Sequence, residues 1–111
     1  MPMCQFQCLY HTDQGYVVRC RECACYQVAF GTAMLSLVQE DFNLLLSILQ
    51  FSVKDTAGLP QGLRNVHIPT PSAAMSLLLT PAEVRCLCEM LQEADNEHRV
   101  SELLGLFGSE S

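Results

Sequence analysis

The sequence predicts an α+β fold, with an N-terminal antiparallel β-meander that carries a Cys-x2-Cys knuckle and two main helices packed on a small sheet. Near the N-terminus, polar and apolar side chains alternate and are interrupted by turn-forming residues, which is typical of strands joined in hairpins. Two later segments carry apolar side chains at helical spacing, each after a short apolar strand. A chain of 111 residues has the length of one ordinary domain, so we expect residues 1–111 to form a single domain.

The predicted meander contains four strands. The first covers residues 6–11 and ends at the turn-forming run Thr12-Asp13-Gln14-Gly15. The second covers 16–20 and returns beside it, and the last two cover 26–30 and 34–38.

The first predicted helix spans residues 39–54 and has two apolar stripes. Its core stripe consists of Phe42, Leu45, Leu46, Leu49 and Val53. The second stripe consists of Leu44, Ile48 and Phe51. We expect the sheet and the second helix to cover both stripes. The alternative is that the second stripe forms an interface with another copy of the chain, since exposed patches of this kind are uncommon on monomers.

The second half repeats the strand-then-helix plan. After a Gly- and Pro-containing loop, short strands are expected over 66–68 and 75–79. A helix then begins with Thr80 as N-cap, Pro81 at the first helical position and Glu83 three residues after the cap. Its buried stripe is Val84, Leu87, Cys88 and Leu91. The stripe loses phase near residues 95–100, so Leu103, Leu104 and Phe107 are expected to form a short final helical turn that ends at Gly108.

The composition restricts the class of partner. The net charge is −6, with only six Lys and Arg. A nucleic-acid binder needs a basic face, but Arg19 and Arg21 have Glu22 beside them, and we expect no basic patch. Nucleic acid and membranes are therefore not expected as partners. No apolar run approaches the roughly 18 residues of a membrane helix, and the N-terminus lacks the pattern of a secretory signal, so we expect a cytoplasmic protein.

The chain contains seven cysteines, and five of them cluster near the N-terminus: Cys4, Cys8, Cys20, Cys23 and Cys25. An odd number of cysteines without a secretory signal is atypical of a disulfide scaffold. In a reducing compartment, clustered cysteines indicate metal or thiol chemistry. Two cysteines at the tip of a β-hairpin, as Cys20 and Cys23 are expected to be, aim two thiolates at one point and predict a zinc knuckle.

The hairpin register selects among the remaining candidates for the zinc ligands. If residues 12–15 form the loop, His11 pairs with Tyr16 and Cys4 lies opposite Cys23, beside the knuckle. His11 then lies at the far end of the hairpin, roughly 13 Å from the knuckle at the rise of a strand. Cys4 is therefore the best third ligand and His11 a poor one.

The fourth ligand depends on the same register. Cys25 is expected to lie across from Cys20, whereas Cys8 falls opposite Arg19 and points to the other face of the hairpin. A slip of one residue would restore Cys8 and demote Cys4. The predicted Zn²⁺ ligands are Cys4, Cys20, Cys23 and Cys25, with Cys8 as the alternative to Cys25.

Two other uses of the cysteines stay open, as packing thiols and as a redox pair. A thioredoxin-like motif lies at a helix N-terminus, which lowers the thiol pKa, but Cys20 and Cys23 lie between strands. Cys86 and Cys88 diverge by about 200° around a helix and are not expected to share a site. Cys88 falls on the buried stripe and is expected to be a core residue.

No motif for a phosphate loop, a metallohydrolase or a nucleophile elbow occurs in the sequence. His98 and Asp95 are three residues apart and are interpreted as a hydrogen-bonded surface pair. No catalytic residue is therefore assigned, and we favour a non-enzymatic protein.

Several motifs resemble a family of small single-domain bacterial proteins of unknown function. The most specific stretch is Gly15-Tyr16-x3-Cys20-x2-Cys23 followed by Gln27-x-Ala29-Phe30-Gly31, and the later motifs are Leu35-x-Leu37, Asp41-Phe42, Ile68-x-Thr70-Pro71, Leu77-x-Leu79 and Leu91-x-Glu93-Ala94. The resemblance covers nearly the whole chain. It implies a bacterial cytoplasmic protein and brings no activity, substrate or cofactor with it.

Taken together, the residues predict a small interaction or regulatory module with a zinc-knuckle-like hairpin, whose partner is another protein or a second copy of the chain. The alternative function is a thiol redox or metal-handling protein that uses Cys20 and Cys23.

Overall fold

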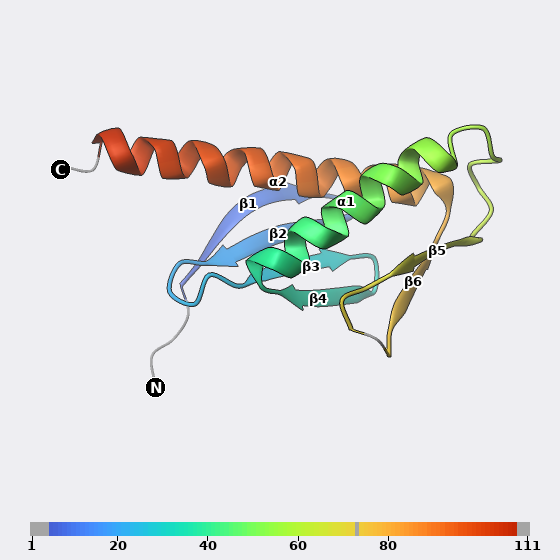
Figure 1. Cartoon of the computed structure of the whole chain (residues 1–111), viewed down its shortest axis with the longest axis horizontal. Coiled ribbons are helices and arrows are strands. Elements are labelled where there is room, and N and C mark those ends of the chain that lie inside the picture. The colour runs from blue at the N-terminus through green and yellow to red at the C-terminus, as the bar shows by residue number, and fades with distance from the viewer. Residues whose placement is uncertain (1–4, 73, 109–111) are drawn as a thin grey trace.

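The computed structural model describes residues 5–72 and 74–108 (Figure 1). Its elements follow the order β1 (Phe6–Thr12), β2 (Gly15–Cys20), β3 (Tyr26–Phe30), β4 (Ala33–Leu37), α1 (Gln39–Asp55), β5 (Val66–Pro69), β6 (Ser76–Leu79) and α2 (Pro81–Gly108). The predicted α+β fold, with its N-terminal antiparallel meander and two helices, is confirmed.

The strands form two sheets. The strands β1 to β4 make a four-stranded antiparallel sheet in sequence order, and β5 and β6 make a separate antiparallel hairpin. The sequence indicated one small sheet, so the second sheet is a difference. Pro69 at the end of β5 has no backbone N–H to donate to a further strand, which favours a short, separate hairpin.

Both helices cover the same face of the larger sheet, and Tyr26 of β3 lies between them. Its ring stacks on Phe42 of α1 with the centroids 4.0 Å apart, and it meets the edge of His98 of α2 at 6.2 Å. Val28 and Phe30 are buried on the same side of β3. One core cluster therefore joins the sheet to both helices and to the second hairpin.

The second apolar stripe of α1 is not covered as expected. Leu44 and Phe51 are 51% and 70% exposed, and only Ile48 packs partly against the core. The N-cap of the helix, Val38, makes no side-chain hydrogen bond to the first turn. The helix presents its other stripe, with Phe42 and Leu45, to the sheet and α2. A helix has too little circumference to present both stripes to a single core.

The helix α2 begins as the sequence predicts. The Thr80 N–H donates to Glu83 Oε1 at 2.9 Å, and the Glu83 N–H donates to Thr80 Oγ1 at 3.0 Å. These two bonds form a reciprocal capping box. None of the helices within the described residues is both long enough and apolar enough to cross a membrane.

The loss of apolar phase after residue 94 does not interrupt α2, which continues to Gly108 and extends beyond the strands (Figure 1). Ala94 is the last buried side chain of the helix among the described ones, and the later turns meet the sheet through His98 and Ser101 rather than through apolar side chains. An ion pair one turn apart stabilises these turns, from Arg99 to Asp95 at 3.0 Å, and His98 Nε2 lies 3.5 Å from the Glu102 carboxylate. The expected pair between His98 and Asp95 is replaced by these two.

Candidate functional site

The β1–β2 hairpin carries most of the candidate ligands, and its register changes along its length. The predicted pairing of His11 with Tyr16 is confirmed, and it places His11 near the hairpin loop. Between Cys8 and Tyr10 the register shifts by one residue. A β-bulge of this kind adds one residue to a strand, here Leu9, whose side chain is buried in the core.

The shift corrects the predicted orientation of Cys8. Phe6 pairs with Cys20, and Cys8 pairs with Val18 rather than with Arg19. Paired residues share a face of a sheet, and residues two apart on a strand do too. Cys8 is therefore on the same face as Cys20, although its side chain is exposed.

Cys4 lies outside the described residues, so its position opposite Cys23 stays a prediction. A shift of register favours Cys8 as a ligand over Cys4 by the sequence argument. The described side chains, Cys8 among them, nevertheless form no group of three that could hold a metal.

The turn between β2 and β3 brings three cysteines together through its backbone. The Cys20 N–H donates to the Cys25 carbonyl at 2.8 Å, so Cys25 lies across from Cys20 as predicted. The Ala24 N–H donates to the Cys20 carbonyl at 3.0 Å, and Ala24 has a φ of 62°. The left-handed conformation is costly for alanine. The turn keeps it because these hydrogen bonds close the chain tightly around Cys20.

The sulfur of Cys20 is buried inside this turn and accepts a hydrogen bond from the Cys23 N–H at 3.4 Å. A backbone N–H that points at a cysteine sulfur stabilises a thiolate. A hydrogen bond to Cys23 is the main cause that raises the pKa of the Cys25 thiol, followed by burial and by the nearby sulfurs, while Arg19 opposes the rise. The three sulfurs are thus close enough to influence one another.

These described residues do not complete a metal site by themselves. Within residues 5–72 and 74–108, no three side chains of His, Cys, Asp or Glu are grouped so that they could hold a metal ion. A four-ligand zinc site at this turn would therefore need a ligand from outside the described part of the chain.

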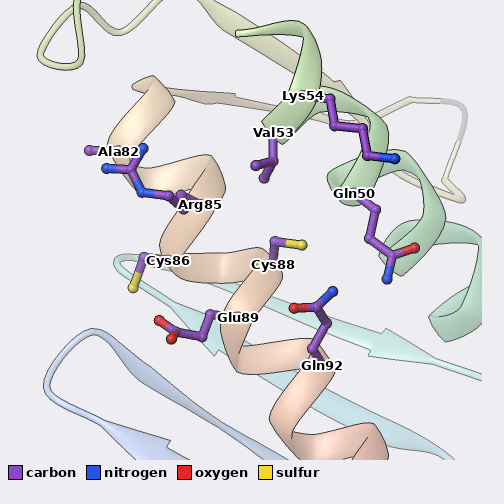
Figure 2. A pocket seen from close by; sticks show the side chains of 9 residues that line it. All are labelled: Gln50, Val53, Lys54, Ala82, Arg85, Cys86, Cys88, Glu89 and Gln92. Atoms are coloured by element: carbon purple, nitrogen blue, oxygen red, sulfur yellow. The ribbon is translucent and has the colours of Figure 1, made fainter. Parts of the chain in front are cut away.

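A second candidate site is the groove between α1 and α2, with a volume of about 880 Å³. Figure 2 shows its lining, which consists of Gln50, Val53 and Lys54 from α1 and Ala82, Arg85, Cys86, Cys88, Glu89 and Gln92 from α2. The Cys88 thiol points toward α1 and the Cys86 thiol points away from it (Figure 2), as their spacing predicts.

The thiols of the groove are poor nucleophiles. Burial is the main cause that raises the pKa of both Cys86 and Cys88, and the Glu89 carboxylate raises both further. Both thiols therefore stay protonated near neutral pH. Cys88 is buried in the core cluster, which confirms its predicted packing role.

Sequence reasoning missed two features near the cysteine turn. The left-handed conformation of Ala24 cannot be recognised from the sequence, because glycine is the residue that usually adopts it. The other feature is the pair Arg19 and Arg21. Glu22 lies between them and Cys23 in the sequence, yet both arginines line one pocket and Glu22 does not.

Comparison with known proteins identifies a family for this chain but no activity. No curated protein matches the chain, and no solved structure matches it. A family model described as a family of unknown function (DUF6686) matches residues 3–106, which include the cysteine hairpin, α1, the second sheet and most of α2. The chain therefore belongs to this family of unknown function.

Proposed function

We propose that the protein is a small non-enzymatic interaction or regulatory module whose cysteine turn binds one Zn²⁺ ion. The observation that carries this proposal is the hydrogen bond from the Cys23 N–H to Cys20 Sγ, 3.4 Å long, at the tip of the hairpin. It favours the thiolate, which is the form of cysteine that binds metals. The proposed ligands are Cys4, Cys20, Cys23 and Cys25.

The backbone near the turn supports a ligand from the N-terminal segment. Gln5 follows Cys4 in the sequence, and its carbonyl accepts a hydrogen bond from the Arg21 N–H at 3.0 Å. The start of the described chain therefore lies beside the turn. A structural zinc ion takes four ligands. The described side chains do not group three of them, so Cys4 would have to join the turn and the turn cysteines would have to close around the metal.

Four protein ligands favour a structural role for the metal, because they leave no coordination position open for a substrate. Zinc would then fix the shape of the hairpin rather than supply chemistry. A rigid hairpin of this kind suits recognition of another protein, which is the partner we propose.

Elemental analysis of protein purified without an affinity tag tests the metal. We expect about one Zn²⁺ per chain, as a closed four-ligand site requires. Cys20→Ser and Cys23→Ser should lose the metal and the order of the hairpin, because binding and folding are coupled. Cys86→Ser is the matched control, since this thiol lies on α2, and it should keep the metal.

Two outcomes contradict the proposal. One is a zinc content below about a tenth of an equivalent in reducing preparations that retain the fold. The other is turnover in the reduction of insulin disulfides with dithiothreitol as donor. That second result would assign Cys20 and Cys23 to thiol redox chemistry, because it requires a reactive thiolate.

A further inference from the structure

A polar pocket of about 400 Å³ lies where the last turns of α2 cross β1 and β2. Its lining consists of Gln7, Arg19, Arg21, His98, Ser101, Glu102 and Leu104. It shares no residue with the groove of Figure 2, and it adjoins the cysteine turn, because Arg21 is a turn residue between Cys20 and Cys23.

The fold brings the pocket residues together from distant parts of the sequence. Gln7 pairs with Arg19 across β1 and β2, and Arg21 follows in the turn after β2. His98 and Ser101 lie one turn apart on α2. The side-chain amide of Gln7 donates to Ser101 Oγ at 3.2 Å, which fixes α2 against β1.

Positive charge is concentrated in this pocket, against the overall charge of the protein. The chain has six Lys and Arg and a net charge of −6, and two of the six are Arg19 and Arg21. Arg64 and Arg99 form ion pairs with carboxylates elsewhere, whereas no ion pair is found for Arg19 or Arg21 within the described chain.

One hydrogen-bond donor of Arg19 has no partner among the described residues. Its guanidinium carbon lies 5.4 Å from the centroid of the Tyr26 ring, which holds the side chain in place. Its Nε is shielded from solvent and has no hydrogen-bond partner among the described residues. A shielded donor without a partner is unfavourable, so an acceptor in the pocket that draws the Arg19 side chain toward it would gain this hydrogen bond.

One acidic residue of the pocket, Glu102, would repel a bound anion. Glu102 lies 3.5 Å from His98 Nε2, but its side chain is 66% exposed. An exposed carboxylate is well solvated and has free space on the solvent side, so it weakens the site without closing it.

We propose that this pocket binds the phosphate group of a small organic molecule. Guanidinium groups present fork-shaped donors that match phosphate oxygens, and the dianion balances the charge of Arg19 and Arg21. The volume exceeds that of phosphate alone, which leaves room for a small organic part. The acidic remainder of the protein repels nucleic acid and anionic membranes, so the ligand is a single small phosphate monoester.

Calorimetric titration with inorganic phosphate tests the site, with sodium chloride of equal ionic strength as the reference. We expect saturable binding of about one equivalent, with a dissociation constant on the order of 1 mM. Arg21→Gln should weaken binding about tenfold, because a charge-assisted hydrogen bond is lost. Arg21 is exposed, so its replacement should leave the fold intact, whereas Arg19 packs on Tyr26.

A second variant should change the affinity for phosphate in the opposite direction. Glu102→Gln removes the opposing carboxylate from an exposed position and should tighten phosphate binding about threefold. Arg85→Gln is the matched control, because Arg85 is exposed and lines the other groove, and it should bind phosphate as the wild type does.

The proposal is overturned if phosphate binding does not saturate, or if Arg85→Gln weakens it as much as Arg21→Gln. It is also overturned if Glu102→Gln has no effect, since a carboxylate at the site must repel the anion. The zinc content of Arg21→Gln should equal that of the wild type, which separates the failure of this proposal from failure of the zinc proposal.

Discussion

Glu83 joins the start of α2 to the loop before β5. Its carboxylate accepts hydrogen bonds from the Thr80 N–H at 2.9 Å and from Arg64 Nη1 at 2.7 Å. Burial raises the pKa of Glu83, but the hydrogen bonds from Thr80 and Arg64 outweigh this effect and hold the pKa below its usual value. The ionised carboxylate therefore stabilises the folded state more than the unfolded one.

The lowered pKa of Glu83 determines how its contribution varies with pH. The stabilisation is present above the unfolded pKa of about 4.3 and is lost as pH falls through the lower folded pKa. We expect Glu83→Gln to reduce the free energy of unfolding by about 1 kcal/mol at neutral pH and by less at about pH 3. Urea denaturation at both pH values measures the difference.

Glu97→Gln, at an exposed position of the same helix, is the control and should change little at either pH. A loss of stability in Glu83→Gln that is equal at both pH values would show that the charge of Glu83 has no role.

At the residue scale, local contacts were predictable and distant ones were not. The capping box of Thr80 and Glu83 spans three residues, so the sequence alone indicates it. The pairing of Cys20 with Cys25 follows from a short turn and was also predicted. The contact of His98 with Tyr26 depends on how α2 crosses the sheet, which no local pattern encodes.

At the scale of elements, Gly15 allows β2 and β3 to approach each other closely. It pairs with Phe30, and a side chain at Gly15 would overlap the carbonyl oxygen of Ala29. The backbone carbonyl is part of the sheet and has no free rotation with which to move away. A glycine is therefore required here for space rather than for an unusual backbone conformation.

Gly15→Ala should reduce the free energy of unfolding by about 2 kcal/mol, because the two strands must separate locally. Gly58→Ala is the control, since a Cβ at Gly58 would meet nothing within 4 Å. Thermal and urea unfolding of the two variants check this expectation. Equal stability of both variants would mean that β2 and β3 are not held so closely.

The register of the first hairpin shows why elements are easier to predict than their pairing. The turn residues fix the pairing of His11 with Tyr16. The bulge at Leu9 arises because apolar side chains follow one another in β1, and Leu9 and the next residue both reach the core. Whether a strand accepts such a bulge depends on the core that it meets, so the orientation of Cys8 was predicted wrongly.

At the scale of the whole molecule, α1 leaves an apolar stripe at the surface. Leu44 and Phe51 are exposed and lie on one side of the helix with Ile48. Water contact with such a stripe is unfavourable. We expect two copies of the chain to bury it between them in a symmetric dimer.

Light scattering at micromolar concentration should give twice the chain mass of 12.3 kDa. The double variant Leu44→Ser and Phe51→Ser should give the mass of one chain and remain folded, because neither side chain belongs to the core. Gln50→Ala, at an exposed position about 120° around the helix from Leu44, is the control and should remain dimeric. A single-chain mass for the wild type would reject the interface.

The fold class was predictable because it depends on the spacing of apolar side chains, and in most elements this spacing matches a helix or a strand. The existence of two sheets was not, because β5 and β6 have the same strand pattern whether they extend the first sheet or pair alone. That choice is made by tertiary packing, in which Val66 and Ile68 join the core beside α1.

The extension of α2 beyond the core has a thermodynamic consequence for the pocket it lines. The molecule is 51 Å long, and the turns after Ala94 add helix without adding buried apolar area. Such turns open by local fraying at a smaller cost than global unfolding. Ser101 is withdrawn from the pocket when such fraying reaches it, whereas His98 is held against Tyr26 and the sheet and the cysteine turn stay folded. Occupancy of the pocket and order of the helix end are linked, and a ligand there would slow the exchange of the last backbone amides with solvent.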